Sequence, residues 1–188
     1  MAIVATSTLV DVCFTVCTAL SESDITAVLC GGSAATFYAP QAYQSKDADF
    51  VITMRGDTSK GGGVMKALGY TLRGSTYQHA TNCFTVDFPV GPLAIGDDLI
   101  ASWETFKREQ EHLHVLSRTD VVRDRLLWYY AYTDISALHA AVAVAMSGEV
   151  SLITLRDWSV REGEDDTFSE FLSRVQKAVA LYEPDHRV

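Results

Sequence analysis

The chain changes its hydrophobic pattern near residue 118, and this change limits the folds that it can adopt. Before this point, short apolar runs typical of β-strands alternate with helical segments. After it, apolar residues recur only at the three- and four-residue spacing of amphipathic helices. The pattern predicts an α+β fold, with a small mixed β-sheet core and flanking helices over residues 1–118, followed by a C-terminal helical subdomain over residues 119–188.

The expected elements follow from apolar spacing and from the positions of Gly and Pro. In the first part, helices are predicted over residues 6–20, 33–38 and 58–68, strands over 25–30, 50–53 and 84–88, and a further strand that opens at Gly69-Tyr70. Each Gly costs about 1 kcal/mol relative to Ala inside a helix, so the helix near residue 60 is expected to begin after Gly61, Gly62 and Gly63. Residues 89–98 are predicted to form a loop.

The second part is predicted to be helical throughout. Helices are expected over residues 120–132, 135–146, 151–159 and 167–182. Thr167 and Glu170 have the spacing of a capping box at the start of the last helix.

Charge and hydropathy exclude some classes of partner. The net charge of −9 argues against a broad nucleic-acid surface, because phosphate binding depends on clustered Lys and Arg. The apolar N-terminus lacks a basic region and is interrupted by Asp11, which is not typical of a signal peptide. The twelve uncharged residues 135–146 are too few to span a bilayer. A cytoplasmic protein without a membrane partner is therefore expected.

The four cysteines are Cys13, Cys17, Cys30 and Cys83, and none of them form a C-x-x-C motif. Their apolar neighbours predict small buried side chains in a reducing compartment. No further ligands for a zinc ion stand near them in the sequence. His112 and His114 point to one side of an expected strand, and they are interpreted as ordinary polar residues.

Three aspartates carry most of the chemical information. Asp47 and Asp49 lead into an apolar strand, and their spacing of two points both side chains to the same face. Asp87 lies between Val86 and Phe88 in another strand, where an unpaired carboxylate is expensive. A shared divalent cation would remove these penalties. Two alternatives stay open: a solvated turn for the pair, and an outward-facing edge position for Asp87, whose strand Pro89 is expected to end early.

A Gly-Ser turn precedes the acid pair. Gly32 and Ser33 lie between an expected strand and an expected helix. Backbone N–H groups at such a turn bind anions, and glycine allows a phosphate to approach closely. The turn and the aspartates together are suited to a nucleoside triphosphate with Mg²⁺.

These motifs resemble the nucleotidyltransferase superfamily related to DNA polymerase beta. Its signature is a hydrophobic residue, Gly and Gly or Ser, about a dozen residues, Asp-x-Asp, and a third acid on a later strand. The stretches VLCGGSAA and SKDADFVI carry the resemblance, with residues 34–46 between the two motifs. They are similar to compact bacterial members, including the AbiEii group of toxins, and residues 116–126 resemble a segment of such relatives.

The resemblance implies roles for the site residues. Gly32 and Ser33 would hold the β- and γ-phosphates. Asp47 and Asp49 would hold a nucleotide-bound Mg²⁺ or Mn²⁺. Asp87 would join them on a second ion and help to deprotonate the attacking hydroxyl, so that a nucleoside monophosphate moves to an acceptor and pyrophosphate leaves.

Weaker candidates come from the charged residues around these motifs. One of Arg123 and Arg125 is expected to face the cleft and neutralise the triphosphate, and Asp124 to form a salt bridge between the two parts of the chain. A solvated face with one ion pair is the alternative. Lys46 is interpreted either as a phosphate contact or as a local counter-charge.

The acceptor stays open among RNA, protein and small molecules. A toxin-type enzyme would imply a cognate antitoxin as a partner. Two other functions stay open: a non-catalytic nucleotide-binding protein that retains the fold, and a metal-dependent phosphohydrolase.

Overall fold

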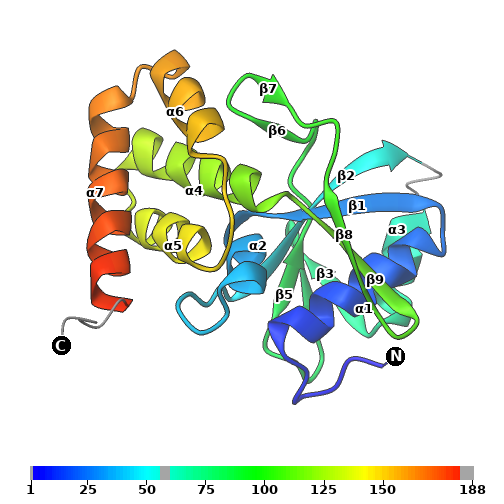
Figure 1. Ribbon diagram of the computed structural model, residues 1–188. Coiled ribbons are helices and arrows are strands. Elements are labelled where there is room, and N and C mark those ends of the chain that lie inside the picture. Colours follow the sequence, from blue (N-terminus) through cyan, green and yellow to red (C-terminus); the bar gives the residue numbers. More distant parts are fainter. Residues whose placement is uncertain (1, 56–59, 183–188) are drawn as a thin grey trace.

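The computed structural model of the protein describes residues 2–55 and 60–182, and these form seven helices and a mixed sheet (Figure 1). The helices are α1 (Leu9–Ser21), α2 (Gly31–Tyr38), α3 (Gly61–Ala67), α4 (Arg118–Tyr132), α5 (Ile135–Met146), α6 (Leu152–Arg161) and α7 (Asp165–Tyr182). The strands are β1 (Ile25–Cys30), β2 (Asp47–Arg55), β3 (Tyr70–Arg73), β4 (Thr76–His79), β5 (Thr85–Asp87), β6 (Ala94–Ile95), β7 (Asp98–Leu99), β8 (Glu104–Arg108) and β9 (Glu111–Val115). The predicted α+β class is confirmed.

Seven of the strands form one sheet in the order β3-β4-β5-β2-β1-β9-β8. The β1–β2 pair is antiparallel, whereas β5 runs parallel to β2 and β9 runs parallel to β1. The sheet is therefore mixed, as predicted. The short strands β6 and β7 pair separately as a small antiparallel ladder.

The helices lie in two groups around the sheet. Helix α1 packs against β1 and β9, whereas α4, α5, α6 and α7 gather at the other end of the molecule, with α2 in contact with α4 and α5 (Figure 1). One hydrophobic core runs through both groups. It includes Val12 of α1, Leu29 of β1, Leu126 of α4 and Phe171 of α7, all of which are buried. The division of the chain at residue 118 stays a prediction.

Most of the predicted elements are present, and the differences have local causes. Strand β2 begins at Asp47, so the acid pair lies within the strand. Gly61, Gly62 and Gly63 form the first turn of α3, although the helix was expected to begin after them. The buried Met65 anchors this helix, and tertiary packing outweighs the low helix propensity of glycine. The expected start near residue 58 lies outside the described residues.

The sequence did not predict strands β4 and β8 of the large sheet. Strands β4 and β8 carry many polar side chains, which hides the alternation of a half-buried strand. The predicted loop over residues 89–98 contains β6 and the first residue of β7. The predicted capping box was wrong, because Thr167 lies inside α7 and its hydroxyl donates to Glu164 Oε2 at 2.7 Å.

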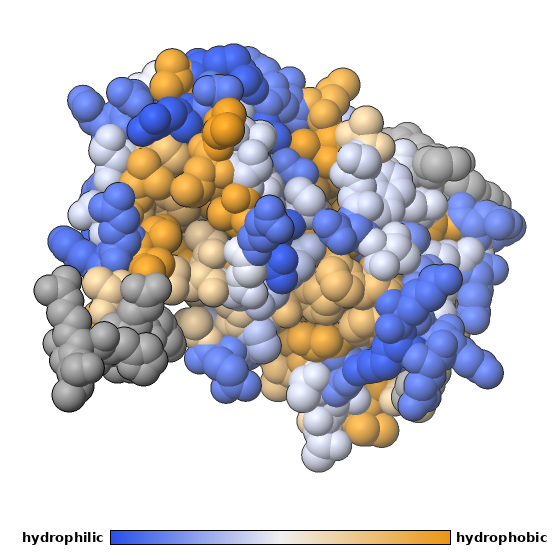
Figure 2. All heavy atoms as spheres, in the orientation of Figure 1, coloured by the Kyte–Doolittle hydropathy of each residue, from blue (hydrophilic) through white to orange (hydrophobic). Residues whose placement is uncertain are grey.

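The surface of the helical group carries exposed hydrophobic side chains, which Figure 2 shows in orange on the face that it displays. They include Leu152, Ile153 and Val160 of α6. Even so, none of the helices in the described ranges has the length and apolar character that crossing a membrane requires.

Candidate active site

Strand pairing brings the three predicted aspartates together. Strands β2 and β5 are parallel neighbours, and their register places Asp49 opposite Asp87 and Asp47 opposite Thr85. One carboxylate oxygen from each of Asp47, Asp49 and Asp87 lies within 4.8 Å of the others. The early end of β5 does not keep Asp87 away, because Asp87 is the last residue of the strand and pairs directly with Asp49. We call these three residues the acid cluster.

The acid cluster concentrates negative charge at a partly buried place. The pKa of Asp49 is raised to about 7, first by burial and then by the charges of Asp47 and Asp87, while Arg125 acts in the opposite direction. Three carboxylates supply only hard oxygen ligands, which Mg²⁺ and Mn²⁺ prefer. A divalent cation would relieve the repulsion that raises this pKa, so the residues fit such an ion.

Helix α2 begins beside the acid cluster, and its first residues are bonded to β2. The Ser33 hydroxyl accepts a hydrogen bond from Asp49 N at 3.0 Å and donates one to Cys30 O at 2.8 Å. The Ser33 side chain is buried, and its hydroxyl serves the fold. It follows that a phosphate at Ser33 would meet the backbone N–H rather than the hydroxyl.

Two glycines keep the start of α2 close to the acid cluster. Gly31 has a φ of +64°, and a Cβ there would stand 2.7 Å from Asp49 Oδ2. A Cβ on Gly32 would stand 3.1 Å from Ser45 Oγ and 3.2 Å from Tyr43 OH. Sequence reasoning assigned Gly32 but missed Gly31. A glycine at the junction of a strand and a helix is the signal that could have found it.

The start of α2 also has free backbone donors. Its N-cap residue, Cys30, makes no hydrogen bond to the helix with its side chain. The first N–H groups of a helix have no partner inside the helix and carry the positive end of its dipole. Together with the close approach that glycine permits, they make this end of α2 suitable for an anion next to the acid cluster.

The two candidate arginines have different surroundings. Arg125 is nearly buried and pairs with Asp124 at 2.8 Å. The charge of Arg125 opposes the rise in the pKa of Asp49, whereas the charge of Asp124 adds to it. Arg123 pairs instead with Asp98 of β7 and, at 3.0 Å, with Asp120.

Arg123 therefore joins helix α4 to the β6–β7 ladder, and its guanidinium also lies over the ring of Trp158. The expected bridging role of Asp124 was wrong, because Asp124 pairs with its neighbour Arg125. The ion pairs across the two parts of the chain join Asp98 to Arg123 and to Arg161.

The remaining sequence candidate, Lys46, is exposed and directly precedes Asp47. The hollow of about 890 Å³ between α5, α7 and the segment after α2 is lined mainly by apolar side chains, and the three aspartates are not among its lining residues. The candidate active site at the start of α2 is therefore separate from this hollow.

No family model matches the chain, and no curated protein matches it. A solution structure of the antibiotic-resistance factor ANT(2'')-Ia is similar over 88% of this chain and 94% of that chain, with 10% identity and a TM-score of 0.46. A crystal structure of ANT(2'')-Ia in complex with adenylyl-2''-tobramycin is similar over 76% of this chain and 100% of that chain, with 12% identity and a TM-score of 0.41. Both TM-scores are below 0.5, so neither similarity assigns an activity to this chain.

Proposed function

We propose that this protein is a metal-dependent nucleotidyltransferase, which moves a nucleoside monophosphate from a nucleoside triphosphate to an acceptor hydroxyl. The observation that carries the proposal is the convergence of Asp47, Asp49 and Asp87 beside the uncapped start of α2. A cation site and an anion site lie side by side there, as a metal-bound triphosphate requires.

The three carboxylates would hold Mg²⁺ or Mn²⁺. When bound, such an ion supplies charge neutralisation at the phosphate oxygens and orients them for an in-line displacement. Asp47 is held in place by a hydrogen bond of 2.7 Å from the Ser45 hydroxyl, and Asp49 by the bond from its backbone N–H to Ser33. The fold therefore positions both side chains before any substrate arrives.

The reaction requires a bond to form between the acceptor oxygen and the α-phosphorus while the bond from that phosphorus to the pyrophosphate oxygen breaks. The acceptor proton must leave, and we assign its removal to Asp87. The backbone N–H groups at Gly31, Gly32 and Ser33 would bind the phosphates, and Arg125 would offset their charge. Lys46 is assigned an outer phosphate contact, because its side chain is exposed next to the acid cluster.

The experiment that tests this function uses each of the four nucleoside triphosphates, labelled at the α-phosphorus, with Mg²⁺ or Mn²⁺. Separate reactions contain RNA, protein or small-molecule fractions of a cell extract as acceptors. The variant Asp47→Asn with Asp49→Asn removes the cation site, and Asp97→Asn, at an exposed position outside it, is the matched control.

The expected result is transfer of label together with pyrophosphate release by the wild type and by Asp97→Asn, and neither by the double variant. Label on one fraction would identify the acceptor class. Release of inorganic phosphate alone would favour a metal-dependent phosphohydrolase. Nucleotide binding without any product would favour a non-catalytic nucleotide-binding protein. A toxin role with an antitoxin partner stays a prediction from the sequence resemblance.

A further inference from the structure

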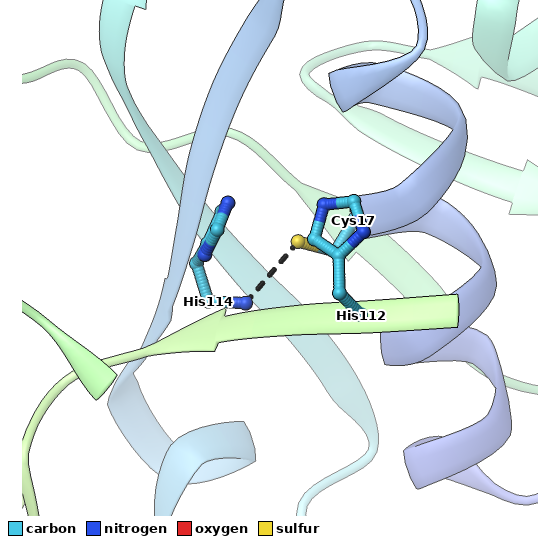
Figure 3. Close-up of side chains that lie close together, drawn as sticks. All are labelled: Cys17, His112 and His114. Atoms are coloured by element: carbon cyan, nitrogen blue, oxygen red, sulfur yellow. Dashed lines mark hydrogen bonds between the residues drawn. The ribbon is translucent and has the colours of Figure 1, made fainter. Parts of the chain in front are cut away.

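A second group of metal-ligating side chains lies between helix α1 and strand β9. It consists of Cys17 of α1 and of His112 and His114 of β9, and Figure 3 shows the sulfur beside the two imidazole rings. One ligand atom from each residue lies within 4.8 Å of the others. We call these residues the Cys-His cluster. No zinc ligands stand near the cysteines in the sequence, but the fold brings both histidines to Cys17.

Backbone hydrogen bonds hold α1 against β9 at this place. The Thr18 hydroxyl accepts a hydrogen bond from His112 N at 2.9 Å and donates one to His112 O at 3.1 Å. One residue earlier on α1, the Cys17 sulfur accepts a hydrogen bond from His114 N at 3.3 Å (Figure 3). Because His112 and His114 are two apart on the strand, both rings lie on one face, with their centroids 5.0 Å apart.

Each imidazole has one nitrogen bonded to a hydroxyl. His112 Nε2 lies 2.8 Å from Ser21 Oγ, and His114 Nδ1 lies 2.9 Å from Thr105 Oγ1. Metal-binding histidines usually hydrogen-bond through the nitrogen that does not hold the metal, and this bond fixes the ring orientation. These bonds leave His112 Nδ1 and His114 Nε2 as the nitrogens for a metal ion.

Burial changes the pKa of two members of the Cys-His cluster. It lowers the pKa of His114, and the neighbouring His112 lowers it further. Burial raises the pKa of the Cys17 thiol to about 11. A bound cation must therefore displace the thiol proton to solvent.

We propose that the Cys-His cluster binds one zinc ion, with Cys17 Sγ, one nitrogen of each histidine and a solvent molecule as the four ligands. A thiolate and two imidazoles are the donors that zinc prefers, whereas Mg²⁺ prefers oxygen. Binding releases one proton from Cys17, and the ion then links α1 to β9. Ligand atoms around tetrahedral zinc lie about 3–4 Å apart, and the three ligand atoms of the Cys-His cluster already lie within 4.8 Å of one another.

Zinc binding is tested by titration of the metal-free protein with Zn²⁺, and by titration with Co²⁺ to observe the charge-transfer absorption between cobalt and a thiolate. This absorption requires a sulfur ligand, so ions on the acid cluster do not produce it. The ligand variants are Cys17→Ser and His114→Gln. The matched controls are Cys13→Ser, one turn earlier on α1 and also buried, and His139→Gln, at an exposed position on α5.

The expected result is one Zn²⁺ per chain and a thiolate absorption with Co²⁺, both retained in the two controls. Each ligand variant should weaken zinc binding by at least about 100-fold. Zinc at about 100 times its Kd should raise the Tm of the wild type by about 5–10 °C.

Absence of the thiolate absorption in the wild type would overturn the proposal, and so would unchanged zinc affinity in both ligand variants. If Cys17→Ser does not fold, His114→Gln decides the outcome, because its side chain is partly exposed. The zinc site does not depend on the proposed function, since loss of nucleotide transfer in an acid-cluster variant leaves this titration unchanged.

Discussion

The acid cluster and the Cys-His cluster are assembled in different ways. Two neighbouring strands form the acid cluster, and the parallel register of β2 and β5 places Asp49 directly opposite Asp87. The Cys-His cluster joins residues that are 97 positions apart at most, through the packing of α1 on β9. The ionised carboxylates of the acid cluster repel one another. The Cys-His cluster carries no charge when its thiol is protonated and both imidazoles are neutral. Short spacing in the sequence therefore reveals the acid cluster but not the Cys-His cluster.

The largest effect is expected when the acid cluster loses a ligand. Asp47→Asn should reduce nucleotide transfer by about 10³-fold or more, because only one of the two carboxylates on β2 that hold the cation would remain. The zinc affinity of the same variant should stay within about twofold of the wild type, since the two clusters share no residue. Parallel transfer assays and zinc titrations measure both effects. A large loss of zinc affinity would mean that the clusters are coupled.

Substitutions of the two arginines should distinguish a role in stability from a role in nucleotide transfer. Arg123→Gln should lower the free energy of unfolding by about 2 kcal/mol, because Asp98 and Asp120 lose a buried ion-pair partner. Arg125→Gln should reduce transfer by about 10–100-fold with a smaller change in stability.

Urea unfolding and kcat/KM, measured on both arginine variants, distinguish these roles. If Arg123→Gln reduced kcat/KM of the folded protein as strongly as Arg125→Gln, its assignment to the fold would be wrong.

Two glycine substitutions examine the space beside the acid cluster. Gly31→Ala should destabilise the protein by about 1–2 kcal/mol, because its φ is positive and the new Cβ meets Asp49. Gly63→Ala is the matched control in α3, where a Cβ meets nothing within 4 Å, and it should stabilise the protein by up to about 1 kcal/mol. Urea unfolding of both variants measures the difference. Equal stability of the two variants would contradict the close approach at Gly31.

The smallest expected effect is a pH dependence of stability that comes from Asp49. Its folded-state pKa of about 7 lies above the usual value for an aspartate, so the folded protein keeps a proton that the unfolded chain loses first. The stability from this group is fully present below the unfolded pKa of about 4 and is lost as the pH rises through 7.

Without metal, Asp49→Asn should therefore be about 1–2 kcal/mol more stable than the wild type at pH 8, and the difference should shrink at pH 5. Urea unfolding in the presence of a chelator measures this, with Asp97→Asn as the control. A pH-independent difference would show that the carboxyl is ionised throughout.

The sequence predicted the central strands and the acid cluster for identifiable reasons. Strands β1, β2 and β5 are apolar runs bounded by Gly, Pro or Asp, and residues 135–146 form the predicted helix with the same bounds. The spacing of Asp47 and Asp49 is enough to put both on one face. That Asp87 pairs with Asp49 depends on strand order, which local patterns do not encode.

The missed features depend on conformation or on long-range packing. The sequence does not show which of Gly31 and Gly32 has the positive φ. That depends on the conformation of the junction between β1 and α2. Strands β4 and β8 carry mainly polar and charged side chains, which also occur in loops. The Cys-His cluster requires the contact between α1 and β9, which no spacing within either segment reveals.

The two hydrogen bonds of the Ser33 hydroxyl have a consequence for the rate of ligand association. It joins the last residue of β1, the first turn of α2 and the middle of the acid cluster through a single buried atom. These two bonds hold the start of α2 against Asp49, so an anion at α2 and a cation on the aspartates would lie at a separation that the fold sets. A ligand that carries both charges meets a surface already set to its dimensions, so its association loses less conformational entropy and needs no slow rearrangement of the chain.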